Sequence, residues 1–385
     1  MAGGAIAPLP RSTRGRPRTV ASPHWQTSPI TSSPDGSHGT MREGTTYVAD
    51  DERARKRRAV VVYHPTKVNL KRLERLLDRE ETRAGWAASA WVATELDAGT
   101  DELNRRILAE QADVVIAAGG DGTVRAVAEA VRHHRVPLGI LPVGSTNLLA
   151  RNLGLALIGS AAAVRAALTG EERLIDVGTV TATLVDGRHL TRAFLVMAGF
   201  GVDAQMVVHT SPASKEALGW LAYVNGVTRG ITSKDRFDVV YRLDGGRSRS
   251  ARLHTLVIGN GGRLPAGLRL LPNAVIDDGE LDLVLIRPDG MRGWGELAAW
   301  WVWENNLLQR ILRHNGRRRP MPAVGSVQQA RAREVRIAIA GGEDFQIDGE
   351  YLGKVTALRV TVEHRALRVR VPTGRSAPSA EPPRS

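Results

Sequence analysis

The sequence contains no cysteine, and it has no apolar run long enough to span a bilayer. The absence of cysteine excludes disulfide bonds, thiolate metal sites and a cysteine nucleophile, and it fits a reducing cytoplasm. The N-terminus also lacks the apolar segment of a signal peptide. We therefore expect a cytoplasmic protein that is soluble or peripherally associated with the inner face of the membrane.

Acidic residues are fewer than basic ones: the chain has 40 aspartates and glutamates and 53 lysines and arginines, which gives a formal net charge of +13. Such a chain is attracted to anionic surfaces, either nucleic acid or anionic lipid headgroups. No RNP-like, zinc-finger or homeodomain pattern is present, so we expect no nucleic-acid partner and favour a membrane surface. A basic surface that only maintains solubility is the alternative.

The composition predicts two tails and two folded domains. Residues 1–57 and 372–385 are polar and proline-rich, which predicts disordered tails, the first of them basic. Residues 58–174 alternate apolar strands with helical patterns, which predicts an α/β nucleotide-binding domain with a parallel, Rossmann-like sheet. Closely spaced β-like runs in residues 175–371 predict a β-sandwich as the second domain.

Apolar periodicity places the expected elements. In the first domain we expect strands at residues 59–63, 90–94, 114–118 and 137–142, and helices at 68–84, 101–111, 124–131 and from Leu148 onward. In the second we expect strands at residues 177–185, 190–197, 237–243, 253–258, 281–286, 335–340 and 357–362.

One segment of the second domain, residues 291–319, has a different pattern. It contains four of the eight tryptophans, apolar residues at helical spacing, and a run of arginines at its end. An amphipathic helix of this composition can lie in a membrane interface. Packing of the rings in the core of the β-domain is an alternative of equal weight.

Two glycine-bearing loops give the strongest functional signal. The first, Gly119–Thr123 (GGDGT), joins a buried-looking strand to a helix, and the second, Val143–Asn147 (VGSTN), follows the next strand. Such junctions expose backbone N–H groups, and glycine lets a phosphate approach them. Because open parallel sheets bind ligands at the carboxyl ends of their strands, the loops predict one nucleotide-binding crevice. A tight turn capped by Asp121 is the structural alternative for the first loop.

Further motifs follow in order between about Ala59 and Val371: LGILPVGSTNLLARNL, IDVG at 175–178, FGVDA at 200–204, NAVIDDGELD at 273–282 and IDGE at 347–350. With GGDGT, they resemble the diacylglycerol kinase catalytic family, which includes bacterial soluble lipid kinases, sphingosine kinases and ceramide kinases. GGDGT alone is shared with the NAD kinases. The resemblance implies an ATP-dependent, Mg²⁺-using lipid kinase that acts at an anionic membrane surface and converts diacylglycerol to phosphatidate. A monomer and a homodimer both stay open.

The resemblance also assigns nucleotide binding to nine residues, which are Thr94, Gly119, Gly120, Asp121, Gly122, Thr123, Gly144, Ser145 and Asn147. The glycine backbones would cradle the phosphates, and Thr123 would cap the following helix or bond a phosphate oxygen. Asp121, counted among the catalytic residues, would hold Mg²⁺ directly or through water, since that cation prefers carboxylate and water oxygens.

Two acidic motifs remain. In DDGELD, the resemblance implies a second, structural Mg²⁺ held by the Asp278 carboxylate and the carbonyls of Val275 and Glu280, where local chemistry alone favours a solvated turn. In IDGE, it implies that Asp348 or Glu350 is the general base that takes the proton of the lipid hydroxyl, and we favour Glu350. A hairpin turn is the local alternative.

The chain departs from the commonest family pattern in two places. Arg125 stands where that pattern has asparagine, and the first strand ends in His64-Pro65 instead of Asn-Pro. An arginine at the start of that helix reaches nucleotide phosphates or points to solvent. Two further functions stay open at this point: an NAD kinase-like activity, and a catalytically silent, membrane-associated protein that binds lipid or nucleotide.

Overall fold

The computed structural model describes residues 55–94, 100–155, 161–201, 236–264, 269–290, 292–293, 295–297 and 325–374. Residues Arg53–Ser385 group into one unit, within which all of these lie. Three sequence expectations fall wholly or mainly outside the described residues: the two tails, most of the FGVDA motif and most of the tryptophan-rich segment. Among the residues described, no helix combines the length and apolarity that a bilayer crossing requires.

Four parallel strands form the sheet of the N-terminal half, in the order β4-β3-β1-β2. They are β1 (Ala59–Tyr63), β2 (Ala90–Ala93), β3 (Val114–Gly119) and β4 (Leu138–Pro142). β3 and β4 are buried along their whole length and β1 along nearly all of it, as continuous apolar runs require in a sheet covered on both faces. The predicted Rossmann-like parallel sheet is confirmed.

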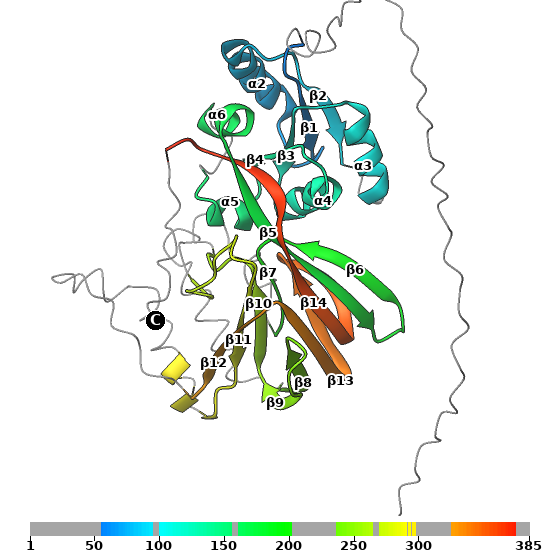
Figure 1. The fold of residues 1–385 in the computed structure, drawn as a ribbon, viewed down its shortest axis with the longest axis vertical. Coiled ribbons are helices and arrows are strands. Elements are labelled where there is room, and N and C mark those ends of the chain that lie inside the picture. Colours follow the sequence, from blue (N-terminus) through cyan, green and yellow to red (C-terminus); the bar gives the residue numbers. More distant parts are fainter. Residues whose placement is uncertain are drawn as a thin grey trace, which may run out of the picture. The chain divides into compact units, whose positions relative to one another are not determined.

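Helices cover both faces of this sheet (Figure 1). α2 (Leu70–Ala84) and α6 (Ala161–Thr169) pack on one face, and α3 (Thr100–Ala109), α4 (Asp121–Val131) and α5 (Leu148–Asn152) pack on the other. Successive strand residues point to opposite faces, so Val61 joins the core beneath α2 while Val60 joins the core beneath α4. α2 is capped at its N-terminus by Asn69, whose side chain accepts the N–H of Arg72, and at its C-terminus by Gly85 in the left-handed conformation.

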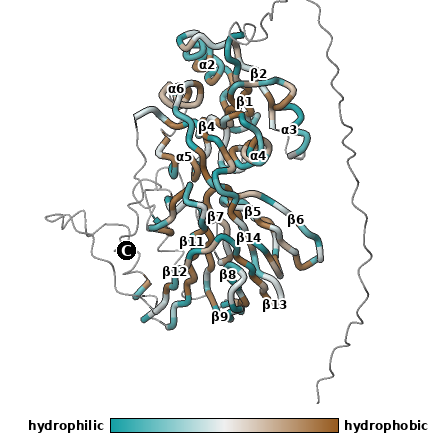
Figure 2. The backbone as a smooth tube through the Cα atoms, viewed as in Figure 1, coloured by the Kyte–Doolittle hydropathy of each residue, from teal (hydrophilic) through white to brown (hydrophobic). Residues whose placement is uncertain are grey.

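The C-terminal half is an antiparallel β-sandwich, as predicted. Its strands are β5 (Glu171–Leu184), β6 (His189–Phe194), β7 (Met197–Phe200), β8 (Phe237–Leu243), β9 (Arg249–Leu253), β10 (Thr255–Gly259), β11 (Leu281–Ile286), β12 (Val327–Ala332), β13 (Glu334–Ile347) and β14 (Glu350–Val371). Apolar residues run along these strands (Figure 2). Their inward faces share a core in which the rings of Phe200 and Phe345 lie 4.8 Å apart.

β14 connects the two halves. It pairs with β13 and β5 in antiparallel fashion and, near its end, with β4 of the parallel sheet through the Val369–Leu138 pair. Its pairing with β5 is interrupted between Glu363 and Leu367, where Arg365 has a φ of 51°. One hydrogen-bonded path of strands therefore runs from β12 through β14 to β2.

The structure differs from the expected elements at several ends. The single strand expected at 190–197 is divided into β6 and β7 at Leu195-Val196, and that expected at 253–258 is divided at His254. α4 begins at Asp121, three residues before the apolar pattern does. β12 was not expected, because half of its sequence VQQARA is polar and the strand is only partly buried.

Candidate active site

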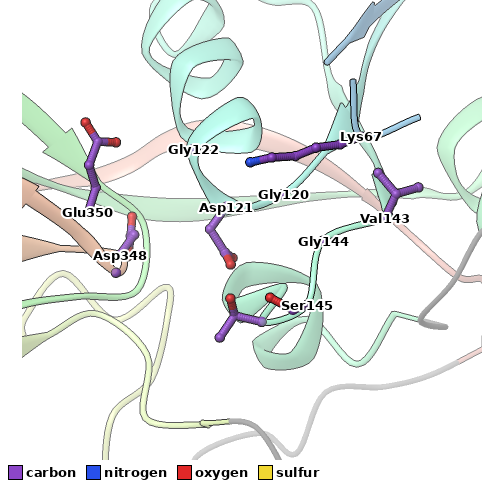
Figure 3. Close-up of a pocket in the computed structure, with 11 residues that line it drawn as sticks. Lys67, Gly120, Asp121, Gly122, Val143, Gly144, Ser145, Asp348 and Glu350 are labelled. Carbon is purple, nitrogen blue, oxygen red and sulfur yellow. The ribbon is translucent and has the colours of Figure 1, made fainter. Parts of the chain in front are cut away.

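A cleft of about 440 Å³ lies at the carboxyl ends of β3 and β4 (Figure 3). The first glycine-bearing loop supplies Gly120, Asp121 and Gly122, and the second supplies Val143–Thr146. Three residues of the β13–β14 turn, Asp348, Gly349 and Glu350, form another wall, and Lys67 follows β1. The two loops that were expected to share a crevice therefore line one cleft, and the IDGE motif, more than 200 residues further along the chain, lines it too.

The two glycine-bearing loops touch each other through their backbones. A Cβ atom placed on Gly144 would lie 2.6 Å from the Cα of Gly120, so the second loop has no room for a side chain at this contact. Asn147, in the left-handed conformation, fixes the second loop, because its side chain accepts the N–H of Gly144 at 3.1 Å and donates to the Gly144 carbonyl at 2.6 Å. Asn147 therefore shapes the loop and does not line the cleft.

Asp121, the first residue of α4, ties the loops together. Its carboxylate accepts the N–H of Leu148, at the start of α5, at 2.5 Å. Burial raises the pKa of this carboxyl group, while hydrogen bonds from Leu148, Thr146 and Asn147 favour the charged form and oppose the shift. The side chain points toward the second loop and still contributes to the cleft wall (Figure 3).

Asp348 is a buried carboxylate in the β13–β14 turn, with a φ of 45°. One of its oxygens accepts the N–H of Leu195 at 2.7 Å, and the other accepts those of Val196 and Met197 at 2.9 and 3.0 Å. These bonds explain why the strand expected at 190–197 is divided there. Burial raises the pKa of Asp348 to about 6, although the three donors favour its charged form.

Glu350 has a more open environment than Asp348. Its side chain is 50% exposed, and one carboxylate oxygen is paired with the guanidinium of Arg125. The same oxygen would lie 3.9 Å from a Cβ atom on Gly122, which places it beside the first turn of α4. Arg125 is itself buried and also lies 3.6 Å from Glu129, whose carboxylate accepts the N–H of Ala193 at 2.6 Å. Arg125 therefore links Glu350 to the interior of the protein.

Of the remaining residues predicted to bind the nucleotide, one lines the cleft and three do not. Ser145 is exposed in the cleft wall. Gly119 and Thr123 pack against each other, since a side chain on Gly119 would collide with that of Thr123, which is buried. Thr94 follows β2, and its hydroxyl donates to the Tyr63 carbonyl at 3.1 Å. Gly119, Thr123 and Thr94 do not line the cleft.

Lys67 is a charged residue of the cleft to which sequence reasoning gave no role. It follows β1, which pairs with β3, so its loop reaches the same sheet edge as the GGDGT loop. Its amino group is directed into the cleft (Figure 3). The signal for it was a lysine just after an apolar strand, but the sequence does not give the strand order that makes this loop a neighbour of the other two.

The carboxylate expected to hold a structural Mg²⁺, that of Asp278, is engaged by protein groups. Asp278 pairs through Oδ2 with the guanidinium of Arg331, which also contacts Glu280 Oε2 at 3.0 Å. The other oxygen of Asp278 accepts the N–H of Glu280 at 3.1 Å, and Val275 lies in the preceding loop. Both carboxylate oxygens of Asp278 therefore face protein donors, so this carboxylate as arranged does not fit Mg²⁺. Within the described ranges, no three His, Asp or Glu residues are placed to hold a metal ion.

Asp282, in β11, belongs to the same acidic group. Its side chain is 10% exposed and lies 3.7 Å from Arg331. Burial raises the pKa of this carboxyl to about 6, and Asp278 and Glu280 add to the rise while Arg331 opposes it. Burial likewise raises the pKa of Asp278. This group lies outside the residues that line the cleft.

Known proteins match this chain over both halves. Residues 58–180 match the family model of the diacylglycerol kinase catalytic domain, and residues 196–294 match that of the YegS C-terminal NAD kinase beta sandwich-like domain. A protein of Pseudomonas aeruginosa named probable lipid kinase YegS-like is 33% identical over 319 residues, which cover 79% of this chain and 94% of that protein. A diacylglycerol kinase of Staphylococcus epidermidis is 25% identical over 316 residues, or 80% and 90% of the two chains.

The fold also has solved relatives. Two crystal structures from Bacillus anthracis, each described as that of a diacylglycerol kinase, superpose on this chain with TM-scores of 0.61 and 0.55, at 18% and 17% identity. Each superposition covers 83% of this chain and 98% of the other. The cleft built from GGDGT, VGSTN and IDGE, together with these matches, shows that the chain is a kinase that belongs to the diacylglycerol kinase catalytic family.

Proposed function

We propose that this protein is an ATP-dependent lipid kinase that transfers the γ-phosphate of ATP to the hydroxyl of diacylglycerol and so makes phosphatidate for phospholipid synthesis. The observation that carries the proposal is the position of Glu350. It is half-exposed on the wall of a cleft whose other walls are two glycine-bearing loops and a lysine. A carboxylate beside a phosphate-sized, N–H-rich cradle is what phosphoryl transfer to an alcohol requires.

The triphosphate would bind at the N-terminus of α4. Gly120 and Gly122 bring backbone N–H groups and the positive end of the helix dipole to the cleft, and Gly144 of the second loop brings a second backbone segment to the same place. Lys67 adds a cation on the opposite wall, which favours the charge of the β- and γ-phosphates. Mg²⁺ would enter with ATP as part of the substrate and neutralise phosphate charge.

In the chemical step, Glu350 accepts the proton of the lipid hydroxyl as that oxygen attacks the γ-phosphorus. The bond between the γ-phosphorus and the bridging oxygen breaks, and ADP leaves with the electron pair. We assign the base to Glu350 and not to Asp348, because both oxygens of Asp348 already accept backbone N–H groups. Asp348 is then a positioning residue that fixes the turn carrying Glu350, and Asp121 positions the second loop against the first.

A lipid acceptor requires access to a membrane, and we propose that the protein binds the anionic inner face peripherally. The net charge of +13 supports this proposal. Two arginines just before β1 contribute less to this charge at the surface, since Arg55 pairs with Asp113 and Arg58 with Glu110 at 3.2 Å each.

The test is transfer of labelled γ-phosphate from Mg²⁺-ATP to a panel of acceptors presented with anionic liposomes. The panel contains diacylglycerol, ceramide, sphingosine, phosphatidylglycerol and NAD. We expect label in diacylglycerol. Label in another lipid alone would keep the lipid kinase and correct the acceptor, whereas label in NAD alone would overturn the proposal. ATP binding with no transfer to any lipid would favour a silent binding protein.

A further inference from the structure

Three carboxylates near the start of β11 share one arginine. We name Asp278, Glu280 and Asp282 the acidic corner. The guanidinium of Arg331 pairs with Asp278 Oδ2, lies 3.0 Å from Glu280 Oε2 through one terminal nitrogen, and lies 3.7 Å from Asp282 Oδ1 through Nε. All three nitrogens of the planar guanidinium thus face carboxylate oxygens, which is a geometry that arginine allows and lysine does not.

The position of Arg331 is set by the sheet. β12 pairs with β11 in antiparallel register, and in that register Arg331 stands directly opposite Asp282. Directly opposite residues on neighbouring strands have side chains within contact distance. Arg331 is therefore placed at the acidic corner by backbone pairing over the six residues of β12, and not only by attraction between flexible side chains.

The loop that precedes β11 is held by protein groups on its other side as well. The buried carboxylate of Asp176 accepts the N–H of Gly279 at 2.6 Å and that of Arg365 at 2.6 Å. Within the loop, Asp278 Oδ1 accepts the N–H of Glu280. The sequence DDGE therefore has its turn closed by hydrogen bonds, and its outward carboxylate oxygens are directed at a cation that the chain itself supplies.

We propose that Arg331 takes the place of a structural divalent cation in this protein, so that the acidic corner is neutralised from within and the fold needs no metal there. A divalent ion at this position would need several oxygens converging at about 2.0–2.6 Å. The guanidinium instead lies among the side-chain oxygens of the acidic corner: it bonds to Asp278 and Glu280 at hydrogen-bond distance and lies 3.7 Å from Asp282. The inference concerns stability and does not depend on the proposed reaction.

The first test is thermal unfolding of the nucleotide-free protein in excess EDTA and in millimolar Mg²⁺ or Ca²⁺. We expect the Tm of the wild-type protein to be the same in all three. Arg331→Gln removes the charge and keeps a polar side chain of similar reach, and we expect its Tm in EDTA to fall by about 2–4 °C. Added divalent cation should restore part of that loss, because three unbalanced carboxylates then attract it.

The matched control is Arg359→Gln. Arg359, on β14, also pairs with a carboxylate at the protein surface, that of Glu334, but it faces one carboxylate and not three. Its Tm should not respond to Mg²⁺ or Ca²⁺. A cation response as large as that of Arg331→Gln would show that loss of any surface arginine suffices, and it would overturn the inference.

Two other results would overturn it. One is a wild-type Tm that falls in EDTA and rises with Mg²⁺ in a way that Asp278→Asn abolishes; a response that survives Asp278→Asn arises elsewhere and leaves the inference supported. The other is an Arg331→Gln protein that is as indifferent to cations as the wild type. The wild-type measurement decides the matter even if Arg331→Gln fails to fold.

Discussion

Two arginine–carboxylate groups in this protein use the same chemistry for different ends. In the cleft, the arginine is the buried partner: the side chain of Arg125 is 8% exposed, while that of Glu350 is 50% exposed. At the acidic corner the order is reversed, since Arg331 is 46% exposed and Asp282 is 10% exposed. A buried arginine can hold a carboxylate out toward a substrate, whereas an exposed arginine neutralises carboxylates that are partly inside.

The difference between the two groups can be tested most directly at Glu350. Glu350→Gln keeps the size and the hydrogen-bonding capacity of the side chain but removes the base, so kcat should fall by about 10²–10⁴-fold. The Tm should change little, because the side chain is half-exposed. The measurement is steady-state transfer from labelled ATP, with Tm as the control for folding. A kcat within a factor of about three of the wild type would remove Glu350 from the chemistry.

Asp348 also lines the cleft, but both of its carboxylate oxygens accept backbone N–H groups. Its raised pKa can be tested through the pH dependence of the protein's stability. Because the folded protein raises that pKa to about 6, the native state binds more protons than the unfolded chain between about pH 4 and 6. The contribution of Asp348 to the free energy of unfolding is therefore present at low pH and is lost as the pH rises through about 6.

The measurement is urea unfolding of the wild type and of Asp348→Asn over this range. The stability of the wild type relative to the variant should decrease by about 2 kcal/mol from pH 4 to pH 7, since a pKa difference of one unit corresponds to 1.36 kcal/mol. A difference between the two proteins that does not change with pH would contradict the raised pKa.

The catalytic contribution of Arg125 can be distinguished from a purely structural role by comparison with Arg132, which follows α4. Arg125→Asn introduces the residue of the commonest family pattern and frees Glu350, and we expect kcat to fall roughly tenfold with little change in KM for ATP. Arg132, after the last turn of α4, also pairs with a glutamate of β14, Glu363, at 3.2 Å. Arg132→Asn should lower the Tm and leave kcat intact. Equal effects of the two variants on kcat would make Arg125 structural as well.

Lys67 should give the smallest effect. Lys67→Met removes a charge from the cleft and keeps the aliphatic stem, so KM for ATP should rise by about five- to tenfold with kcat less affected. Lys71→Met is the control, because Lys71 is an exposed lysine of α2 that does not line the cleft. An unchanged KM in the Lys67 variant would place the phosphates away from that wall.

The sequence predicted the parallel sheet well because its strands are unbroken apolar runs that are buried on both faces. It predicted the edges of the β-sandwich less well. β12 alternates polar and small residues on a partly exposed strand, and no periodicity signal marks it. The division between β6 and β7 comes from a carboxylate about 150 residues away, which no local pattern can reveal.

The site shows the same limit. GGDGT and VGSTN could be paired from sequence, because each follows a strand and such ends meet at one edge of a sheet. The roles within them could not be read in the same way: Asn147 and Thr123 prove to shape the loops and not to line the cleft. The residue that faces Asp278 lies on a strand that was not expected. The family resemblance implied oxygen ligands there and local chemistry a solvated turn, and neither indicated an ion pair.

β14 has a mechanical consequence. The strand begins with Glu350 on the cleft wall and ends in register with β4, whose own end carries the opposite loop. The two walls are thus joined by one continuous ribbon, and they cannot swing apart about a free linker. Opening of the cleft would therefore require β14 to bend. The strand pairing is interrupted between Glu363 and Leu367, so the bend is expected there.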